Sequence, residues 1–189
     1  MKPADPAAVR KGRIYLLLVV LVFVAPAIVA GLLSLSGWQP GTKGHGQPIL
    51  PQRNFVNEQL QVRLDDGRSY AWRDSEPRLT LVALAGPDCA ARCVATLTSM
   101  AAARVTLGRN QSRLRLLYLG TPPADETDDG IRNYWQLGQD VDGKLASFQP
   151  TAPDSVSAML VESNGTALSL YPAGFDPSGL RRDLQKVVK

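Results

Sequence analysis

The sequence has one histidine and only two cysteines among its 189 residues, and this scarcity excludes several kinds of site. No histidine follows His45, so the remainder of the chain can hold neither a Ser-His-Asp triad nor a histidine-rich zinc centre. No phosphate-binding or dinucleotide-binding glycine loop is present. The acidic side chains show no spacing typical of a catalytic carboxylate pair. Whether the chain is an enzyme therefore depends on its two cysteines.

Charge is absent from residues 14–35, a stretch of 22 positions. A helix of this length rises roughly 33 Å, and a hydrocarbon core is about 30 Å thick. Pro26 lies within the stretch, and membrane helices tolerate proline. The sequence therefore predicts one transmembrane helix over residues 14–35, with the lipid bilayer as a partner.

The basic residues before this stretch predict its orientation. The tail 1–13 has a net charge of +3 from Lys2, Arg10, Lys11 and Arg13 against Asp5, whereas the rest of the chain carries 17 basic and 16 acidic side chains. The positive-inside rule then predicts a cytoplasmic tail over 1–13, a linker over 36–52 and an exported domain over 53–189. For a bacterium this means a single-pass inner-membrane protein with a periplasmic domain. The nearly neutral domain argues against nucleic acid as a partner.

A cleaved signal peptide is the alternative interpretation of the N-terminal stretch. Ala25-Pro26-Ala27 has the small-x-small form of a cleavage site. The domain is exported in either case, and two cysteines in an oxidising compartment can persist as a disulfide.

Strand and helix patterns alternate after residue 53. Gln59–Leu64 and Ser69–Trp72, on either side of a turn, predict a β-hairpin. Arg78–Leu84 and Arg113–Leu119 are nearly continuous apolar runs, which are typical of strands buried on both faces. Cys93–Leu107 has the composition of a helix that ends at Gly108.

The C-terminal third continues this alternation. Asp128–Gly138 predicts a short helix, and Ala158–Glu162 and Thr166–Tyr171 predict two strands joined by an Asn-Gly turn. Asp176 precedes Pro177, which suits the first position of a helix that runs to Val188. The expected fold is therefore α/β: a thioredoxin-like domain with an added N-terminal hairpin, preceded by one transmembrane helix.

Cys89 and Cys93 lie between the first buried strand and the following helix. Residues four apart on a helical turn have Cα atoms about 6 Å apart, which a disulfide can bridge. A helix N-terminus favours the thiolate form, Arg92 adds positive charge, and Asp88 is placed to cap the helix. Two thiolates can bind Cu(I), or can cycle between dithiol and disulfide. A structural disulfide that closes the loop is the third alternative.

The segment LTLVALAGPDCAARCVATLTSM, with the later MLVESNGTALSLYPAGF and YPAGFDPSGLRRDLQKVV, resembles the SCO-type (SCO1/SenC-like) copper chaperones. RVTLGRNQSRLRLLYL is similar to a divergent, membrane-anchored branch linked to proteobacterial cytochrome c oxidase assembly. The resemblance implies a thioredoxin fold in which Cys89 and Cys93 assist oxidase maturation, by handling Cu(I) or by reducing thiols. Oxidase subunits or other assembly factors would be its partners.

The sequence departs from the family pattern at the metal site. Ala90 and Ala91 replace the Pro-Asp between the two cysteines, and Asp154 stands near the position of the distal histidine. The candidate metal ligands are therefore Cys89 and Cys93, joined by Asp154 or by a linker that folds back to supply His45. A periplasmic thiol–disulfide oxidoreductase and a non-catalytic assembly factor with a structural disulfide are the alternative functions. Pro153 is a candidate for the cis-proline that thioredoxins place before the hairpin.

Overall fold

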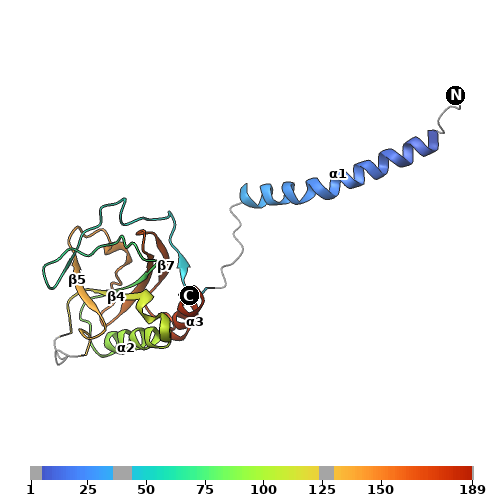
Figure 1. Ribbon diagram of the computed structural model, residues 1–189. Helices are drawn as coiled ribbons and strands as arrows, with labels where there is room; N and C mark the ends of the chain where they lie inside the picture. Colours follow the sequence, from blue (N-terminus) through green and yellow to red (C-terminus); the bar gives the residue numbers. More distant parts are fainter. Residues whose placement is uncertain (1–5, 36–43, 124–129, 189) are drawn as a thin grey trace. The chain divides into compact units, whose positions relative to one another are not determined.

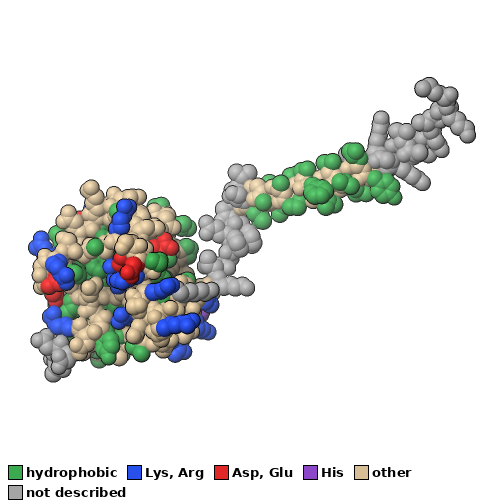
Figure 2. Space-filling view, in the orientation of Figure 1, with side chains coloured by type: hydrophobic (Ala, Val, Ile, Leu, Met, Phe, Trp, Pro, Cys, Tyr) green, Lys and Arg blue, Asp and Glu red, His purple; other side chains and the backbone are tan. Residues whose placement is uncertain are grey.

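The computed structural model describes residues 6–35, 44–123 and 130–188, in two separate units that divide after residue 43 (Figure 1). The first unit holds helix α1 (Pro6–Leu35), which includes the expected span 14–35 and Pro26. Figure 2 shows mainly hydrophobic side chains along the described part of this helix. Within the described ranges no helix combines the length and the apolar character needed to cross a membrane, so the predicted anchor stays a prediction.

The described part of the second unit forms one seven-stranded mixed sheet with the strand order β1-β7-β6-β3-β4-β5-β2. Two helices lie against one face of this sheet (Figure 1). The elements are β1 (Gln47–Pro48), β2 (Val62–Leu64), β3 (Leu79–Ala85), α2 (Ala91–Val105), η1 (Gly108–Arg113), β4 (Leu114–Leu119), β5 (Gln136–Asp140), η2 (Ala146–Phe148), β6 (Val156–Glu162), β7 (Ala167–Tyr171) and α3 (Pro177–Val187).

Strand β3 is the centre of the sheet. It pairs parallel with β4 and antiparallel with β6, and α2 makes the connection between the two parallel strands. From Thr80 to Ala85 every residue of β3 is buried, because alternate side chains meet cores on opposite faces. Leu81 belongs to one core and Val82 to the other. The near-continuous apolar run therefore predicted this strand correctly.

The two faces of the sheet are covered by different kinds of structure. One core is formed with α2 and α3, which contribute Cys93, Leu97, Met100, Leu180 and Leu184. The other is covered by irregular chain before β3, and its buried aromatic residues are Phe55, Tyr70 and Trp72. The Trp72 ring lies 4.8 Å from the Phe55 ring and 4.9 Å from the Tyr70 ring, measured between centroids. These edge-on aromatic contacts fill the space that a helix would occupy.

The expected N-terminal hairpin is short, with a turn after Leu64 and one antiparallel bridge between Arg63 and Ser69. The Leu64 N–H donates to the Arg68 carbonyl and the Tyr70 N–H to the Val62 carbonyl, but the return strand is a single bridge at Ser69. Strand β2 instead pairs with β5 at the edge of the sheet. The return segment leaves the hairpin because Tyr70 and Trp72 are buried in the core on that face.

The predicted helix over residues 128–138 is wrong within the described part of the chain, because Gln136–Asp140 is strand β5. It pairs parallel with β4 and antiparallel with β2. A Cβ atom on Gly138 would lie 3.0 Å from the Arg63 carbonyl oxygen, so glycine permits the close approach of β2. Pairing with two neighbouring strands overrides a weak local helical pattern. Residues 128 and 129 lie outside the described ranges.

Candidate functional site

Cys89 and Cys93 form a disulfide where β3 passes into α2, with Cα atoms 5.2 Å apart. Strand β3 ends at Ala85, and Asp88 takes a left-handed conformation with φ of 54° just before the first cysteine. Cys93 is fully buried in the core beneath α2, whereas Cys89 is partly exposed. The two cysteine residues therefore differ in their exposure to solvent.

Gly86 brings a second loop, residues 150–155, against the cysteine loop. A Cβ atom at Gly86 would lie 2.6 Å from the Ala152 carbonyl oxygen and 2.8 Å from that of Pro150. The Gly86 N–H donates to the Ser155 carbonyl over 2.9 Å. Only a residue without a side chain permits this approach, and the approach places Asp154 beside the cysteines.

Asp154 accepts three backbone hydrogen bonds from the cysteine loop. Its Oδ1 accepts from the N–H groups of Ala90 and Cys93, both over 2.9 Å. Its Oδ2 accepts from the Arg92 N–H over 3.1 Å, and Arg92 Nε lies 3.3 Å from the same oxygen. The first turn of a helix has N–H groups without partners inside the helix. Asp154 lies 61 residues after Cys93 in the sequence and accepts hydrogen bonds from these N–H groups.

These hydrogen bonds lower the pKa of Asp154 to about 2, with the Cys93 N–H as the largest cause. The carboxyl group is therefore ionised at neutral pH. The backbone of Asp154 is left-handed, with a φ of 51°, and its N–H group donates to the Pro87 carbonyl over 2.9 Å. Aspartate and asparagine adopt this conformation more readily than most residues.

Two expectations about this loop are wrong. Asp88 does not cap α2: the helix starts after Ala90, with no side chain of its own segment as cap, and Asp154 provides the acceptor. The bond before Pro153 is not cis; among the described residues the cis peptide bond is Leu50–Pro51. The left-handed residue after Pro153 carries the loop toward the cysteines instead.

His45 lies against α3. Its Nδ1 is 3.3 Å from Asp183 Oδ1, and Tyr171 Oη donates to Asp183 Oδ2 over 3.2 Å. Burial opposes ionisation of Asp183, but hydrogen bonds from His45, Tyr171 and Gly46 hold its pKa below the ordinary value. This network fixes residues 44–48 to the domain, so part of the expected linker 36–52 contributes strand β1 to the sheet.

The site offers few donors for a metal. Within the described ranges, no group of three or more His, Cys, Asp or Glu side chains is placed to hold an ion. Both oxygens of Asp154 are occupied by backbone N–H groups, and His45 is paired with Asp183. Once the disulfide is reduced, Cys89 and Cys93 offer two sulfur donors of the kind that suits Cu(I).

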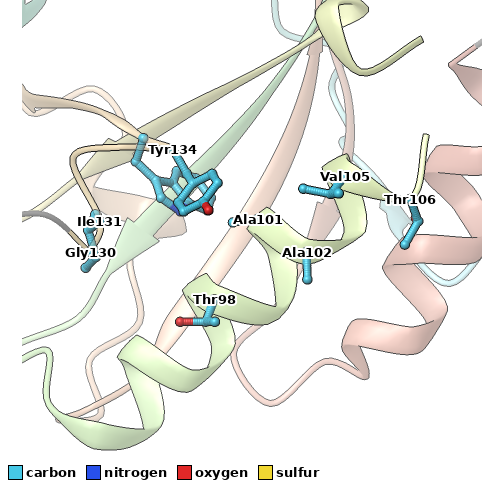
Figure 3. A pocket seen from close by; sticks show the side chains of 9 residues that line it. Thr98, Ala101, Ala102, Val105, Thr106, Gly130, Ile131 and Tyr134 are labelled. Atoms are coloured by element: carbon cyan, nitrogen blue, oxygen red, sulfur yellow. The ribbon is translucent and has the colours of Figure 1, made fainter. Parts of the chain in front are cut away.

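An apolar groove with a volume of about 570 Å³ follows the flank of α2 (Figure 3). It is lined by Thr98, Ala101, Ala102, Val105, Thr106, Gly130, Ile131, Tyr134 and Trp135. Neither cysteine lines it, so it is separate from the disulfide. The sequence pattern gave no indication of this groove, because its two walls come from segments that are distant in the chain.

A model of the family described as transmembrane-like, thioredoxin-like, C-terminal domain matches residues 79–189. The chain belongs to this family. The matched region begins at β3 and includes both cysteines and Asp154. The predicted α/β thioredoxin-like fold is thereby confirmed. No curated protein matches the chain.

Solved structures of low sequence identity align with most of this chain. Peroxiredoxin Q of Xanthomonas campestris is 11% identical, with a TM-score of 0.50 over 76% of this chain and 97% of that one. Copper-bound ScoI of Arabidopsis thaliana is 14% identical, with a TM-score of 0.49 over 76% of this chain and 97% of that one. Apo Sco1 of Thermus thermophilus is 13% identical, with a TM-score of 0.48 over 78% and 96%. At such identities the likeness concerns the fold alone.

Proposed function

We propose that the domain carries out thiol–disulfide exchange through Cys89 and Cys93 in the maturation of cytochrome c oxidase. The unequal exposure of the two cysteine residues is the observation that carries the proposal. Exchange requires one sulfur that a partner can reach and a second that stays close enough to resolve the mixed disulfide. Cys89 is partly exposed and Cys93 is buried within bonding distance.

In the proposed reaction the reduced domain acts as the electron donor. The Cys89 thiolate attacks one sulfur of a partner disulfide, and the partner's other sulfur leaves as a thiolate. Cys93 then attacks the Cys89 sulfur, which restores the Cys89–Cys93 disulfide and releases the second partner thiol. Two electrons pass from the domain to the partner, and an external dithiol reductant returns them.

The assignment to oxidase maturation rests on the resemblance to the SCO-type proteins at the cysteine segment. Export to the periplasm rests on the charge-free residues 14–35 that follow the basic tail 1–13. The proposed location is the bacterial inner membrane, with the domain on its periplasmic side. Oxidase subunits or other assembly factors are the proposed protein partners.

The test is exchange between the folded full-length protein and glutathione, followed by alkylation of free thiols and mass analysis. We expect reversible two-electron reduction under native conditions. Cys93→Ser should accumulate a mixed disulfide at Cys89, whereas Cys89→Ser should accumulate much less, because Cys93 is buried. A disulfide that glutathione and dithiothreitol reduce only after the protein unfolds would contradict the proposal and would indicate a structural crosslink.

Transfer of Cu(I) as cargo is a second candidate function. The observation in its favour is a pair of cysteines on one loop, which after reduction offers two soft sulfur donors. Reduced protein should then bind about one Cu(I) in competition with a chelator, and either Cys→Ser substitution should abolish binding. His45→Ala should leave binding unchanged, because His45 is held at α3. No binding by the reduced protein would exclude this function.

A third candidate function is docking of partner proteins without catalysis, which can be tested by changing both cysteines. If the domain acts only as a docking surface, a strain with both cysteines changed to serine will retain full oxidase activity. Loss of oxidase activity in that strain, at unchanged protein level and unchanged stability of the protein in urea, would exclude a purely structural role.

A further inference from the structure

The carboxylate of Asp154 accepts from backbone N–H groups at the start of α2, beside the two cysteines. Its three backbone donors are the N–H groups of Ala90, Arg92 and Cys93, which lie between the two cysteines or at the second of them. Free N–H groups at a helix N-terminus stabilise a thiolate, and this lowers the free energy of the reduced state. Here the same groups are already bonded to another anion.

We propose that Asp154 is a positioning residue that shifts the Cys89–Cys93 couple toward the disulfide. Reduction of the disulfide gives two thiols, and a thiolate formed from either of them lies close to a carboxylate that keeps both its charge and the N–H groups. The disulfide carries no charge, so it is compatible with the carboxylate. Asp154 therefore stabilises the oxidised loop more than the reduced loop.

Three observations on the site support this role. The Asp154 side chain is 19% exposed, so solvent screens its charge only in part. Its pKa of about 2 keeps it ionised throughout the neutral range. The nearest cation, Arg92, is 80% exposed, and a solvated guanidinium compensates little of that charge.

Asp154→Asn is the informative substitution, because it removes the charge and retains the shape. Asparagine tolerates the left-handed conformation at this position, so the loop keeps its path. The inference deepens the proposed function and rests on the same disulfide. We expect the equilibrium between the disulfide and the dithiol to move about tenfold toward the dithiol, which corresponds to about 30 mV.

Asp176→Asn is the matched control. Asp176 caps α3 by accepting from the N–H groups of Ser178 and Gly179, and no cysteine is near it in the sequence. The two variants lose the same kind of interaction at two helix N-termini. A general loss of helix stability would affect both alike, whereas the proposed effect on the couple belongs to Asp154 alone.

The experiment equilibrates the full-length protein and both variants in glutathione buffers of graded ratio. In this exchange two glutathione thiols become one glutathione disulfide while the protein disulfide becomes two thiols. The reduced fraction is read by alkylation and mass analysis. The expected result is the tenfold shift for Asp154→Asn and a change of less than about twofold for Asp176→Asn. No shift, a shift toward the disulfide, or equal shifts in both variants would overturn the inference.

A second measurement does not depend on exchange in the folded state. The oxidised and the reduced chain are unfolded separately in urea, and their difference in stability reports the same equilibrium through a thermodynamic cycle. Asp154→Asn should reduce the difference in unfolding free energy between the oxidised and the reduced chain, and Asp176→Asn should leave that difference unchanged. A wild-type disulfide that glutathione and dithiothreitol reduce only after the protein unfolds would refute the proposed function, while the urea comparison would still decide the role of Asp154.

Discussion

Helices α2 and α3 differ in the origin of the carboxylate at their N-termini. Asp176 directly precedes α3 and accepts from N–H groups two and three residues later. Ala90 precedes α2 and offers no acceptor, so Asp154 reaches this helix from the loop before β6. The cap of α3 depends on neighbours in sequence alone. The cap of α2, and with it the environment of the disulfide, depends on the contact between two distant loops.

The largest expected effect comes from breaking that contact at Gly86. Gly86→Ala places a methyl group against the carbonyl oxygens of Ala152 and Pro150, which belong to backbone that cannot rotate away. We expect a loss of roughly 3 kcal/mol in the free energy of unfolding, measured in urea. Gly108→Ala is the control, because Gly108 has a left-handed φ of 57° and open space around its Cβ position. A loss at Gly86 no greater than that at Gly108 would show that the loops can separate without cost.

A smaller effect is expected when the remote cap is removed and the loops keep their contact. Asp154→Ala should speed hydrogen exchange at the amides of Ala90, Arg92 and Cys93, because they lose their acceptor. The amides of Ser178 and Gly179 should exchange as before. Asp176→Ala should give the reverse pattern, and NMR can follow both. Unchanged protection at Cys93 in the Asp154 variant would contradict the hydrogen bonds described here.

Acid should weaken the α2 cap by titrating Asp154. Its pKa falls from an ordinary 3.8 to about 2, so its contribution to stability is complete above pH 3.8 and is lost as the pH falls through 2. The free energy of unfolding of the wild type should therefore fall more steeply between pH 4 and pH 2 than that of Asp154→Asn. Urea unfolding at several pH values measures this difference. Parallel curves would mean that the carboxylate has the same pKa in the folded and unfolded chains.

The smallest effect is expected at the exposed cation of the site. Arg92→Gln removes a guanidinium that is 80% exposed and whose Nε lies 3.3 Å from the Asp154 carboxylate. We expect the glutathione equilibrium to change by less than about twofold, since exposed ion pairs contribute little. A change as large as that of Asp154→Asn would make Arg92 the main electrostatic determinant of the couple.

Local patterns predicted a large part of this fold. The apolar run Arg78–Leu84 marked β3, and Asp176 with Pro177 marked the start of α3, because both signals depend on residues next to one another. The same kind of signal failed at Gln136–Asp140, which is strand β5. Its structure is determined by pairing with β4 and β2, and no local pattern reports the presence of such neighbours.

The candidate site, like the fold, could be predicted from the sequence only in part. The spacing of Cys89 and Cys93 was enough to predict that a disulfide can form, and the resemblance to the SCO-type proteins put Asp154 near the position of the distal histidine of their metal site. The sequence did not reveal that the Asp154 oxygens would be occupied by N–H groups of α2, or that His45 would pair with Asp183. Each of these contacts joins residues more than 60 positions apart.

The sequence by itself determined the buried strands, the local cap of α3 and the pair of cysteines at the start of α2. It could do so because burial patterns and contacts within a few residues are properties of short segments. Only the tertiary structure decided which anion lies at the N-terminus of α2 and how far each cysteine residue is exposed. The physical reason is that the sheet, together with the close approach permitted by Gly86, brings Asp154 to N–H groups that their own segment leaves unsatisfied.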